Sequence, residues 1–452
     1  MNITKESTGD LTAIVRIELN KDDYEKEVNI ALKDYQRKAN IPGFRPGKVP
    51  FGMVKKMYGN AVMADKINSI LSESLSTYIK DNDLKILGNP LPNAEKTKAV
   101  DFLNQTEFDF YFDIGFAPNF DLEMSDSIDV DYYKIKIEDK MVDNYLEDMR
   151  KRNGSPVNPE VSEKEDKLYG KFVELDNAGS VLENGISHKA SVLPEYIKLE
   201  EVREKLVGLK IADKIIFNPL KATESVTETA AILGIKSEEA EKLESDFQFT
   251  VEEITRITLA NLDEEFFSKV YPNMGIKTEI ELREQIKKDT AVAYDKESEK
   301  QFMNNAIEKL IETADLPLPD DFLRRWLKEN NEDKITEEQI EGQYDSFARS
   351  MRWHLIESKI VEDHKIEVND GDVRSEIKNY FTSQLPEDNR DEEDERLSGI
   401  VDSVMANKEE VKKISDNLFD DKLLSLFKAK LTISEKDISY EEFVKIASTI
   451  KN

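Results

Sequence analysis

The sequence predicts an elongated α+β multidomain protein, with an N-terminal α+β domain, a β-rich middle domain and an all-α C-terminal domain with helical arms. Three observations lead to this class. The 452 residues are enough for about three domains. Strand-like alternation frames helix-like stripes in the first quarter, and helical periodicity takes over from residue 262 onward.

The first domain is expected to span residues 1–116. Apolar and polar residues alternate over 11–19 and again over 108–116, as they do in half-buried strands. Between these runs, Asn20 is suited to cap a helix, and a second apolar stripe at helical spacing covers 62–78. Two strands that enclose two helices make an α+β unit.

A stiff loop joins the two predicted helices. Residues 40–50 hold three prolines and two glycines, which exclude regular helix and strand. The window 36–64 contains six basic residues and no acidic one, in a chain with 94 Asp and Glu and a net charge of −30. Residues 1–116 have a net charge of −1, and the other residues one of −29. Basic charge on a protruding loop predicts contact with an anionic partner.

A linker and a second domain follow. Residues 117–155 form the linker, with a strand-like run over 128–137 and a short helix over 139–152. The second domain is expected over 156–258, because short β-rich pieces separated by turns replace the helical pattern. Within it, residues 222–245 form an insertion that is acidic and helical in pattern.

The last domain, residues 259–452, is predicted to be helical. Thr336 and Gln339 have the spacing of a capping box at a helix start. The stretch 293–301 is polar on nearly every side, and a helix of that kind is not expected to be buried at every turn. These helices are expected to form extended arms instead of a compact bundle.

The composition limits the cellular compartments and the kinds of catalytic and metal sites that are possible for this chain. The chain has no cysteine, which excludes disulfides, thiolate metal sites and a cysteine nucleophile, and which fits a reducing compartment. Its first residues lack a signal-peptide pattern, and no run of about 18 uncharged apolar residues occurs. We therefore expect a cytoplasmic protein that binds no membrane. The three histidines are too scattered for a zinc site, so neither a metal nor an organic cofactor is expected.

The loop carries a specific motif, Gly43-Phe44-Arg45-Pro46-Gly47-Lys48-Val49-Pro50. Arg45 and Lys48 suit phosphate or carboxylate partners, and Phe44 offers an apolar or stacking contact. An ordinary solvated surface loop is the alternative. A phosphate-binding P-loop is excluded, because the motif is one residue too short and has Val49 where that loop has Ser or Thr.

The motif resembles the G-F-R-x-G-K-x-P ribosome-binding signature of trigger factor, a family of bacterial ribosome-associated chaperones. The order and length of the three predicted domains are similar to those of the family. The resemblance implies an FKBP-like middle domain and two partners: the large ribosomal subunit, through protein and rRNA near the exit tunnel, and unfolded nascent polypeptides. It leaves open a homodimer away from the ribosome. The ribosome-binding residues that it implies are Gly43, Phe44, Arg45, Gly47, Lys48 and Pro50.

In the middle domain the sequence departs from that family. An FKBP-type prolyl isomerase needs an aromatic-lined apolar pocket, and the aromatic residues at the expected places are Phe172, Phe217 and Phe249. The floor segment of the pocket aligns with residues 199–202, which place two carboxylates and an aliphatic residue where an apolar pair, a glycine and a large ring belong. The insertion over 222–245 replaces the segment that supplies a pocket tyrosine. We expect a retained fold with a damaged site, in which the three phenylalanines are core; substantial isomerase activity is the alternative.

Two functions follow from these expectations. The first is an ATP-independent chaperone, tethered by the loop, whose arms shield apolar segments of nascent chains. The second is a prolyl isomerase that acts as a folding catalyst. An export chaperone would share the architecture but would need a signal peptide. We expect some of six apolar arm residues to be partly exposed to clients, the alternative being that all six are arm core: Tyr344, Phe347, Met351, Leu423, Leu424 and Phe427.

Overall fold

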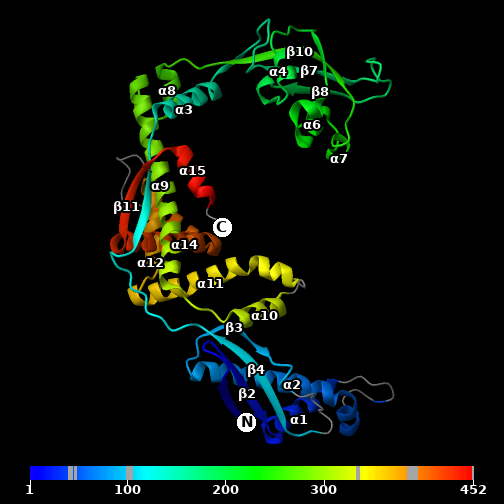
Figure 1. Cartoon of the computed structure of the whole chain (residues 1–452), viewed down its shortest axis with the longest axis vertical. Coiled ribbons are helices and arrows are strands. Elements are labelled where there is room, and N and C mark those ends of the chain that lie inside the picture. Colours follow the sequence, from blue (N-terminus) through cyan, green and yellow to red (C-terminus); the bar gives the residue numbers. More distant parts are fainter. Residues whose placement is uncertain (39–43, 45–47, 98–104, 332–335, 384–394, 450–452) are drawn as a thin grey trace. The chain divides into compact units, whose positions relative to one another are not determined.

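The computed structural model describes residues 1–38, 44, 48–97, 105–331, 336–383 and 395–449. Figure 1 labels the helices and strands of the chain, which divides into two compact units. One unit comprises residues 1–133 and 299–436, and the other comprises residues 134–298 and 437–452. Within the described residues, no helix is long and apolar enough to cross a membrane.

The N-terminal domain belongs to the first unit and contains a four-stranded antiparallel sheet in the order β1-β2-β4-β3. Its elements are β1 (Asn2–Ser7), β2 (Thr12–Leu19), α1 (Lys21–Lys38), α2 (Phe51–Asp81), β3 (Ile86–Pro92) and β4 (Phe108–Phe116). The predicted strands over 11–19 and 108–116 are confirmed as β2 and β4, which pair along their whole length.

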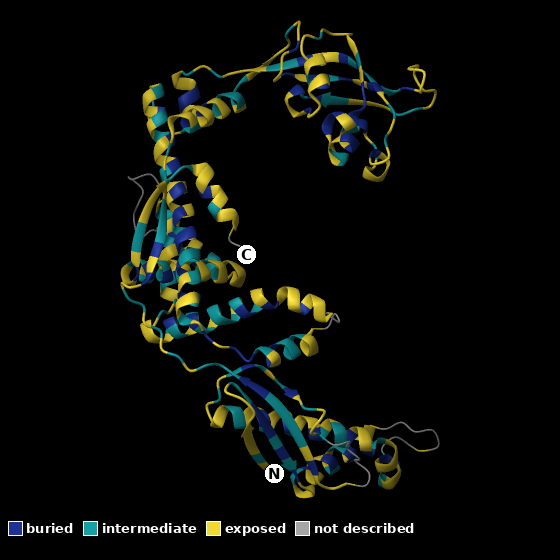
Figure 2. Ribbon diagram, in the orientation of Figure 1, coloured by how far each residue is buried: buried dark blue, intermediate teal, exposed yellow. Residues whose placement is uncertain are grey.

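The core of this domain lies between the sheet and the two helices. Buried positions run along the strands of this sheet (Figure 2). Every second residue of β2 from Ala13 to Leu19 lies in the core, and one face of α1 contributes Tyr24, Val28 and Leu32. Tyr35 continues the apolar stripe of α1 in the sequence, yet its side chain is 47% exposed. Its ring stacks on that of Tyr58 of α2.

A run of helices makes up most of the rest of the first unit. They are α9 (Glu279–Ala314), which begins in the second unit, α10 (Asp320–Asn330), α11 (Glu337–His364), α12 (Asp370–Ser383), α13 (Glu395–Met405) and α14 (Lys408–Lys430). The capping box at the start of α11 is confirmed, because Thr336 and Gln339 exchange the two expected hydrogen bonds.

The helical prediction for the C-terminal segment misses one strand. Residues Thr432–Ile438 form β11, which pairs with β5 (Asp129–Ile135) in a two-stranded sheet. The pairing begins where the Thr432 N–H donates to the Ile128 carbonyl at 3.0 Å. Ile128 and Val130 lie in one apolar core with Phe302 of α9 and Phe427 of α14, so the strand is fixed by packing that the local sequence does not reveal.

The polar stretch 293–301 lies within α9, where one residue in each turn is buried. The expectation that such a helix is not buried at every turn is wrong here, because the buried positions are Tyr294, Ser298 and Gln301. The Gln301 amide donates to the side chain of Asn305, and a small hydroxyl at Ser298 needs little space. Polar side chains can line a packed face when they are short or hydrogen-bonded.

Two glycines of the N-terminal sheet accommodate rings from α10. Gly88 has a φ of +72°, and a Cβ atom there would lie 2.7 Å from the Trp326 indole nitrogen. A Cβ atom on Gly115 would lie 2.5 Å from the Phe322 ring. The Arg325 guanidinium also donates to the Asp113 carboxylate at 2.6 Å. The β3–β4 edge and α10 therefore share one apolar core within the first unit.

The second unit contains a five-stranded antiparallel sheet with β6-β10-β7-β8 in order and β9 paired to β10. Its strands are β6 (Ser155–Val157), β7 (Lys167–Glu174), β8 (Ser187–Val192), β9 (Lys214–Phe217) and β10 (Phe247–Thr258). Its helices are η1 (Pro194–Tyr196), α4 (Glu200–Lys205), α5 (Pro219–Thr223), α6 (Val226–Leu233) and α7 (Ser237–Ala240). The predicted helical character of the 222–245 insertion is confirmed by α6 and α7.

A small helical cluster completes the second unit. It contains α3 (Asp139–Arg152), α8 (Glu264–Val270), the first turns of α9 and α15 (Tyr440–Thr449). The predicted helix over 139–152 is confirmed with the same bounds. Val142 of α3 packs with Phe266 of α8 and Leu282 of α9 in one core.

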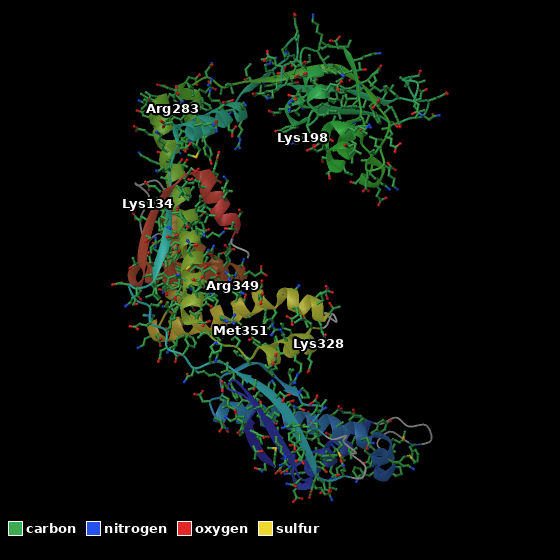
Figure 3. All side chains as sticks on the ribbon, in the orientation of Figure 1. Lys134, Lys198, Arg283, Lys328, Arg349 and Met351 are labelled. Carbon is green, nitrogen blue, oxygen red and sulfur yellow. The ribbon has the colours of Figure 1, made fainter. Side chains whose placement is uncertain are left out.

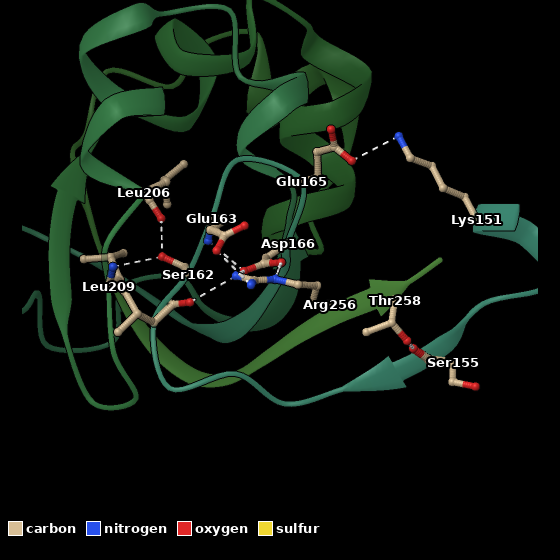
Figure 4. Close-up of polar contacts among 11 residues, drawn as sticks. Lys151, Ser155, Ser162, Glu163, Glu165, Asp166, Leu206, Leu209, Arg256 and Thr258 are labelled. Atoms are coloured by element: carbon tan, nitrogen blue, oxygen red, sulfur yellow. Dashed lines mark hydrogen bonds and ion pairs between the residues drawn. The ribbon is translucent and has the colours of Figure 1, made fainter. Parts of the chain in front are cut away.

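The β-rich domain also contains a buried carboxylate, that of Asp166, whose two oxygens both accept hydrogen bonds. The Asp166 side chain is 1% exposed, and both of its oxygens accept from the Arg256 guanidinium at 2.7 Å (Figure 4). One oxygen also accepts from the backbone N–H of Glu163 at 2.7 Å. Burial alone would raise the pKa of Asp166, but these hydrogen bonds outweigh burial and lower its pKa.

Candidate docking and client-binding surfaces

The signature loop joins α1 to α2, and only part of it lies within the described residues. Gly43, Arg45 and Gly47 lie outside them. Phe44 is 37% exposed, and both Lys48 and Pro50 are exposed. The described residues of the motif therefore present an aromatic ring and an ammonium group at the surface, directly before α2.

The first turns of α2 add surface groups that the sequence analysis did not single out. Met53 is 39% exposed and Met57 is 55% exposed, and Lys56 between them is exposed as well. Residues three and four apart share one face of a helix, so these side chains form one apolar and basic stripe. The signal in the sequence is two methionines four residues apart among lysines, in a helix whose other apolar residues are spaced for the core.

The three candidate pocket residues of the middle domain lie together in its interior. Phe172, Phe217 and Phe249 are 0%, 5% and 0% exposed. The Phe172 ring centroid lies 4.6 Å from that of Phe249 and 5.8 Å from that of Phe217 (edge-on). Their rings contact one another and present almost no surface to a bound peptide.

The floor segment is placed differently from the alignment. Residues 200–205 form α4, on which Val202 faces the core and is 5% exposed. Glu200 and Glu201 point to solvent and pair along the helix with Arg203 and Lys205, at 3.4 and 2.6 Å. The expectation that two carboxylates occupy the floor is therefore wrong. Helical spacing turns them outward and leaves a small aliphatic side chain on the inward face.

Residues of the 222–245 insertion also pack into this apolar core. Ala222 and Leu233, on α5 and α6, are buried in the same cluster as the three phenylalanines. The hydroxyls of Thr223 and Thr229 lie 3.0 Å apart and bond further to backbone carbonyls, so the buried polar groups of the insertion are satisfied. The insertion is thus an integral part of the domain.

The arm residues divide by exposure. Tyr344, Leu423 and Phe427 are 3%, 2% and 0% exposed, whereas Phe347, Met351 and Leu424 are half-buried. The Tyr344 hydroxyl donates to Asp320 at 2.5 Å, and burial together with this hydrogen bond raises its pKa. The three buried residues therefore offer no surface to a client. The sequence could not show this, because an apolar stripe that packs in the core of an arm has the same spacing as one that binds clients.

The helix α11 presents the half-buried pair Phe347 and Met351, and Figure 3 labels Met351 on it. Ion pairs to two other helices hold α11 at its first residue and near its middle. Lys328 of α10 pairs with Glu337 at 2.6 Å, and Arg349 pairs with Glu308 of α9. The Trp326 and Phe347 rings stack with centroids 6.3 Å apart. The partly exposed apolar surface is thus carried by a braced element.

A groove between α12, α13 and α14 was not expected from the sequence. It has a volume of ≈ 570 Å³, and its apolar lining includes Ile377, Phe381 and Leu418. Tyr380 at its edge is 60% exposed. Among the described residues, three carboxylates line it and no basic side chain does; the carboxylates belong to Glu376, Glu410 and Asp421. A groove lined by apolar side chains and carboxylates suits an apolar segment that is flanked by basic residues.

Three family models match the chain. They are described as bacterial trigger factor protein over residues 1–149, the FKBP-like domain of probable trigger factor over 156–259, and its C-terminal domain over 298–447. Together they leave residues 150–155, 260–297 and 448–452 unmatched.

Proteins similar to this chain include bacterial trigger factors and one solved structure. A trigger factor of Pseudomonas aeruginosa is 23% identical over 99% of each chain, and one of Chloroherpeton thalassium is 23% identical over 80% of this chain and 83% of that one. A solved structure described as promiscuous substrate recognition in folding and assembly activities of the trigger factor chaperone is 17% identical, with a TM-score of 0.48 over 94% of this chain and 99% of that chain. With all three of its domain models matched in order, the chain belongs to the trigger factor family of chaperones.

Proposed function

We propose that this chain is an ATP-independent chaperone that docks on the large ribosomal subunit beside the exit tunnel and assists nascent polypeptides in folding. One observation carries the proposal: the signature over 43–50 exposes Phe44 and Lys48 directly before α2, in a window without acidic residues. Membership of the trigger factor family supports the same function.

The chemistry of the loop suits a ribosomal surface. An ammonium group such as that of Lys48 binds rRNA phosphates or protein carboxylates, and an exposed ring such as Phe44 adds an apolar or stacking contact. The N-terminal domain is nearly neutral, so it approaches the polyanionic ribosome without the repulsion that the rest of the chain would experience. Docking through this domain is therefore electrostatically favoured over docking through any other.

Co-sedimentation with large ribosomal subunits tests the docking. The triple variant Phe44→Ala, Arg45→Ala, Lys48→Ala should lose association while it keeps the unfolding temperature, because exposed loop substitutions usually change stability by no more than about 0.5 kcal/mol. The matched control is Lys33→Ala, Lys80→Ala, which removes two exposed lysines elsewhere in the domain and should bind as the wild type does. A triple variant that still co-sediments would overturn the docking assignment.

For clients, we propose that the α12–α14 groove and the half-buried pair Phe347 and Met351 provide the apolar contacts. The carboxylates that line the groove favour clients with Lys or Arg beside their apolar segments. Dispersed apolar groups within a surface of high net negative charge also limit self-association of the chaperone.

Prolyl isomerisation is the alternative activity of the middle domain, and we propose that it is slight. The three aromatic residues suited to a proline pocket are buried against one another, and the floor residue on α4 is the small Val202. An isomerase must offer its substrate an open apolar surface, and this arrangement favours a structural role.

A further inference from the structure

We propose that Gln36 is a positioning residue for docking: its side-chain amide fixes the Val49 peptide, and so fixes the point from which the Lys48 side chain leaves the domain. This inference rests on the proposed function and adds to it a residue outside the signature. Gln36 lies in the last turn of α1, thirteen positions before Val49.

The contact itself is short and bridges two elements. The Gln36 Nε2 atom donates to the Val49 carbonyl oxygen at 2.6 Å, and the contact is partly buried. Val49 lies two residues before the first residue of α2, so the bond ties the end of one helix to the entry of the next. Without Gln36, the Val49 carbonyl would have no hydrogen-bond partner within the part of the chain that the structure describes.

The Val49 side chain is also fixed, because it is packed in the core of the N-terminal domain. It is 1% exposed and belongs to the apolar core with Leu32 of α1 and Val54 of α2. Its neighbours Lys48 and Pro50 are both exposed. The backbone is therefore anchored at a single buried residue between two surface residues, and the anchor sets the direction in which Lys48 points.

A second contact joins α1 and α2 close to Gln36. The Tyr35 and Tyr58 rings stack with centroids 5.9 Å apart and an interplanar angle of 25°. Tyr35 is adjacent to Gln36, and Tyr58 lies two turns into α2. The stack limits movement of the α1 terminus relative to α2, which is the movement that would lengthen the Gln36–Val49 hydrogen bond.

The functional consequence is preorganisation. A charged side chain that leaves from a fixed backbone position loses less conformational freedom on binding than one that leaves from a mobile segment. Gln36 itself need not touch the ribosome, because it acts through Lys48. The physical prediction is that its amide contributes to affinity only when the Lys48 ammonium is present.

The test uses the full-length chain, which has no cysteine, with Glu238→Cys as a single label site on α7. Fluorescence titration with purified large ribosomal subunits gives the dissociation constant. The variant Gln36→Met keeps the length of the side chain and the helix propensity but removes the donor, and it should weaken binding about three- to tenfold. The matched control is Tyr24→Phe, which removes another side chain-to-backbone hydrogen bond of α1, the one to Thr106, and should change binding less than twofold.

A double-mutant cycle separates positioning from general stabilisation. In a Lys48→Ala background, Gln36→Met should weaken binding by less than about 1.5-fold. An equal loss in both backgrounds, or a Gln36→Met variant that binds as the wild type does, would overturn the inference and leave the proposed function intact. A wild-type chain that binds no ribosomal subunits would overturn both. Thermal unfolding of each variant shows whether it is folded. If Gln36→Met is not folded, Gln36→Leu serves as a second variant without the side-chain donor.

Discussion

Arg256 and Asp166, ninety residues apart in the sequence, form a two-pronged ion pair at the base of the β-rich domain. Arg256 is near the end of β10, and Asp166 directly precedes β7, so the pair joins two neighbouring strands. The Asp166 carboxylate is buried, while the Arg256 side chain is 28% exposed and its guanidinium also contacts Glu163 at 2.8 Å. Removal of the carboxylate would leave a partly buried cation without its main partner.

We predict that Asp166→Asn destabilises the β-rich domain by about 2–3 kcal/mol. Breaking one side of a buried pair costs about 3–5 kcal/mol, and the partial solvation of Arg256 lowers that figure. Urea unfolding followed by a probe in this domain measures the effect. The control is Glu163→Gln, whose exposed carboxylate should contribute less than about 1 kcal/mol. An Asp166→Asn loss no larger than that of the control would contradict the prediction.

The same pair predicts how stability depends on pH. The folded pKa of Asp166 is lowered, so its contribution is fully present above the unfolded value of about 3.9 and is lost as the pH falls through the folded value. The stability difference between wild type and Asp166→Asn should be constant from about pH 5 to 7 and shrink below about pH 4. A difference that grew on acidification would mean that the pKa of Asp166 is raised.

We predict that Ala212→Gly stabilises the chain by roughly 0.5–1 kcal/mol. Ala212 has a φ of +75°, a conformation that strains residues with a Cβ atom and that glycine adopts freely. Its N–H donates to the Val251 carbonyl at 2.8 Å, so the turn is fixed by β10. Ala231→Gly on the exposed face of α6 is a control of opposite sign and should destabilise by about 1 kcal/mol. Calorimetry measures the stability of both variants. If both were less stable than the wild type, the prediction of backbone strain at Ala212 would be wrong.

We predict that catalysed isomerisation of short X-Pro peptides is slight. The buried aromatic cluster of Phe172, Phe217 and Phe249 leaves the substrate amide no apolar ring surface to replace water. Protease-coupled kinetics with an intact FKBP-type enzyme alongside decide the question. Rates within tenfold of that enzyme would restore the isomerase as the main activity of this domain.

We predict that the α12–α14 groove discriminates clients by charge. An apolar peptide with lysine flanks should bind roughly five- to tenfold more weakly after Glu376→Gln, Glu410→Gln and Asp421→Asn are combined, since each exposed pair contributes up to about 0.5 kcal/mol. A glutamate-flanked version of the peptide should bind at least as well to the triple variant as to the wild type. Fluorescence anisotropy of the labelled peptides measures both.

The apolar part of the same groove has its own test. Tyr380→Ala should reduce the affinity for either peptide, and the matched control is Tyr196→Ala, a tyrosine of similar exposure on the β-rich domain. Equal effects of the two substitutions would show that any exposed tyrosine serves, and that the groove is not a site.

The sequence was sufficient for elements whose pattern is local. The alternation of β2 and β4 and the amphipathic stripe of α3 are internal to each element, so their bounds could be predicted within one or two residues. β3 could not be predicted in this way, because its residues Ile86–Pro92 include Gly88 and two prolines, which disfavour strands. It forms because its edge pairs with β4 across a register shift.

The candidate surfaces were harder to predict than the elements. Exposure of Phe44 and Lys48 follows from a short, conformationally restricted motif. On the arms, by contrast, a residue such as Phe427 is buried and its neighbour Leu424 is half-buried only because of which helices pack against α14. The groove requires three helices to meet, and no spacing within one helix encodes that.

The pairing of β5 with β11 also orders events in the synthesis of this chain. The Thr432 hydroxyl donates to the Asp126 carbonyl across 306 positions, so residues near 128 wait for nearly the whole chain before their partners exist. At about 5–20 residues per second, that delay is roughly 15–60 s. The strands of the β1–β4 sheet pair with one another, so this sheet can form once residue 116 has been made, and α10 covers its β3–β4 edge later. Throughout the delay Ile128 and Val130 lack Phe427 as their cover, so during its own translation this chaperone carries the kind of uncovered apolar segment that chaperones bind.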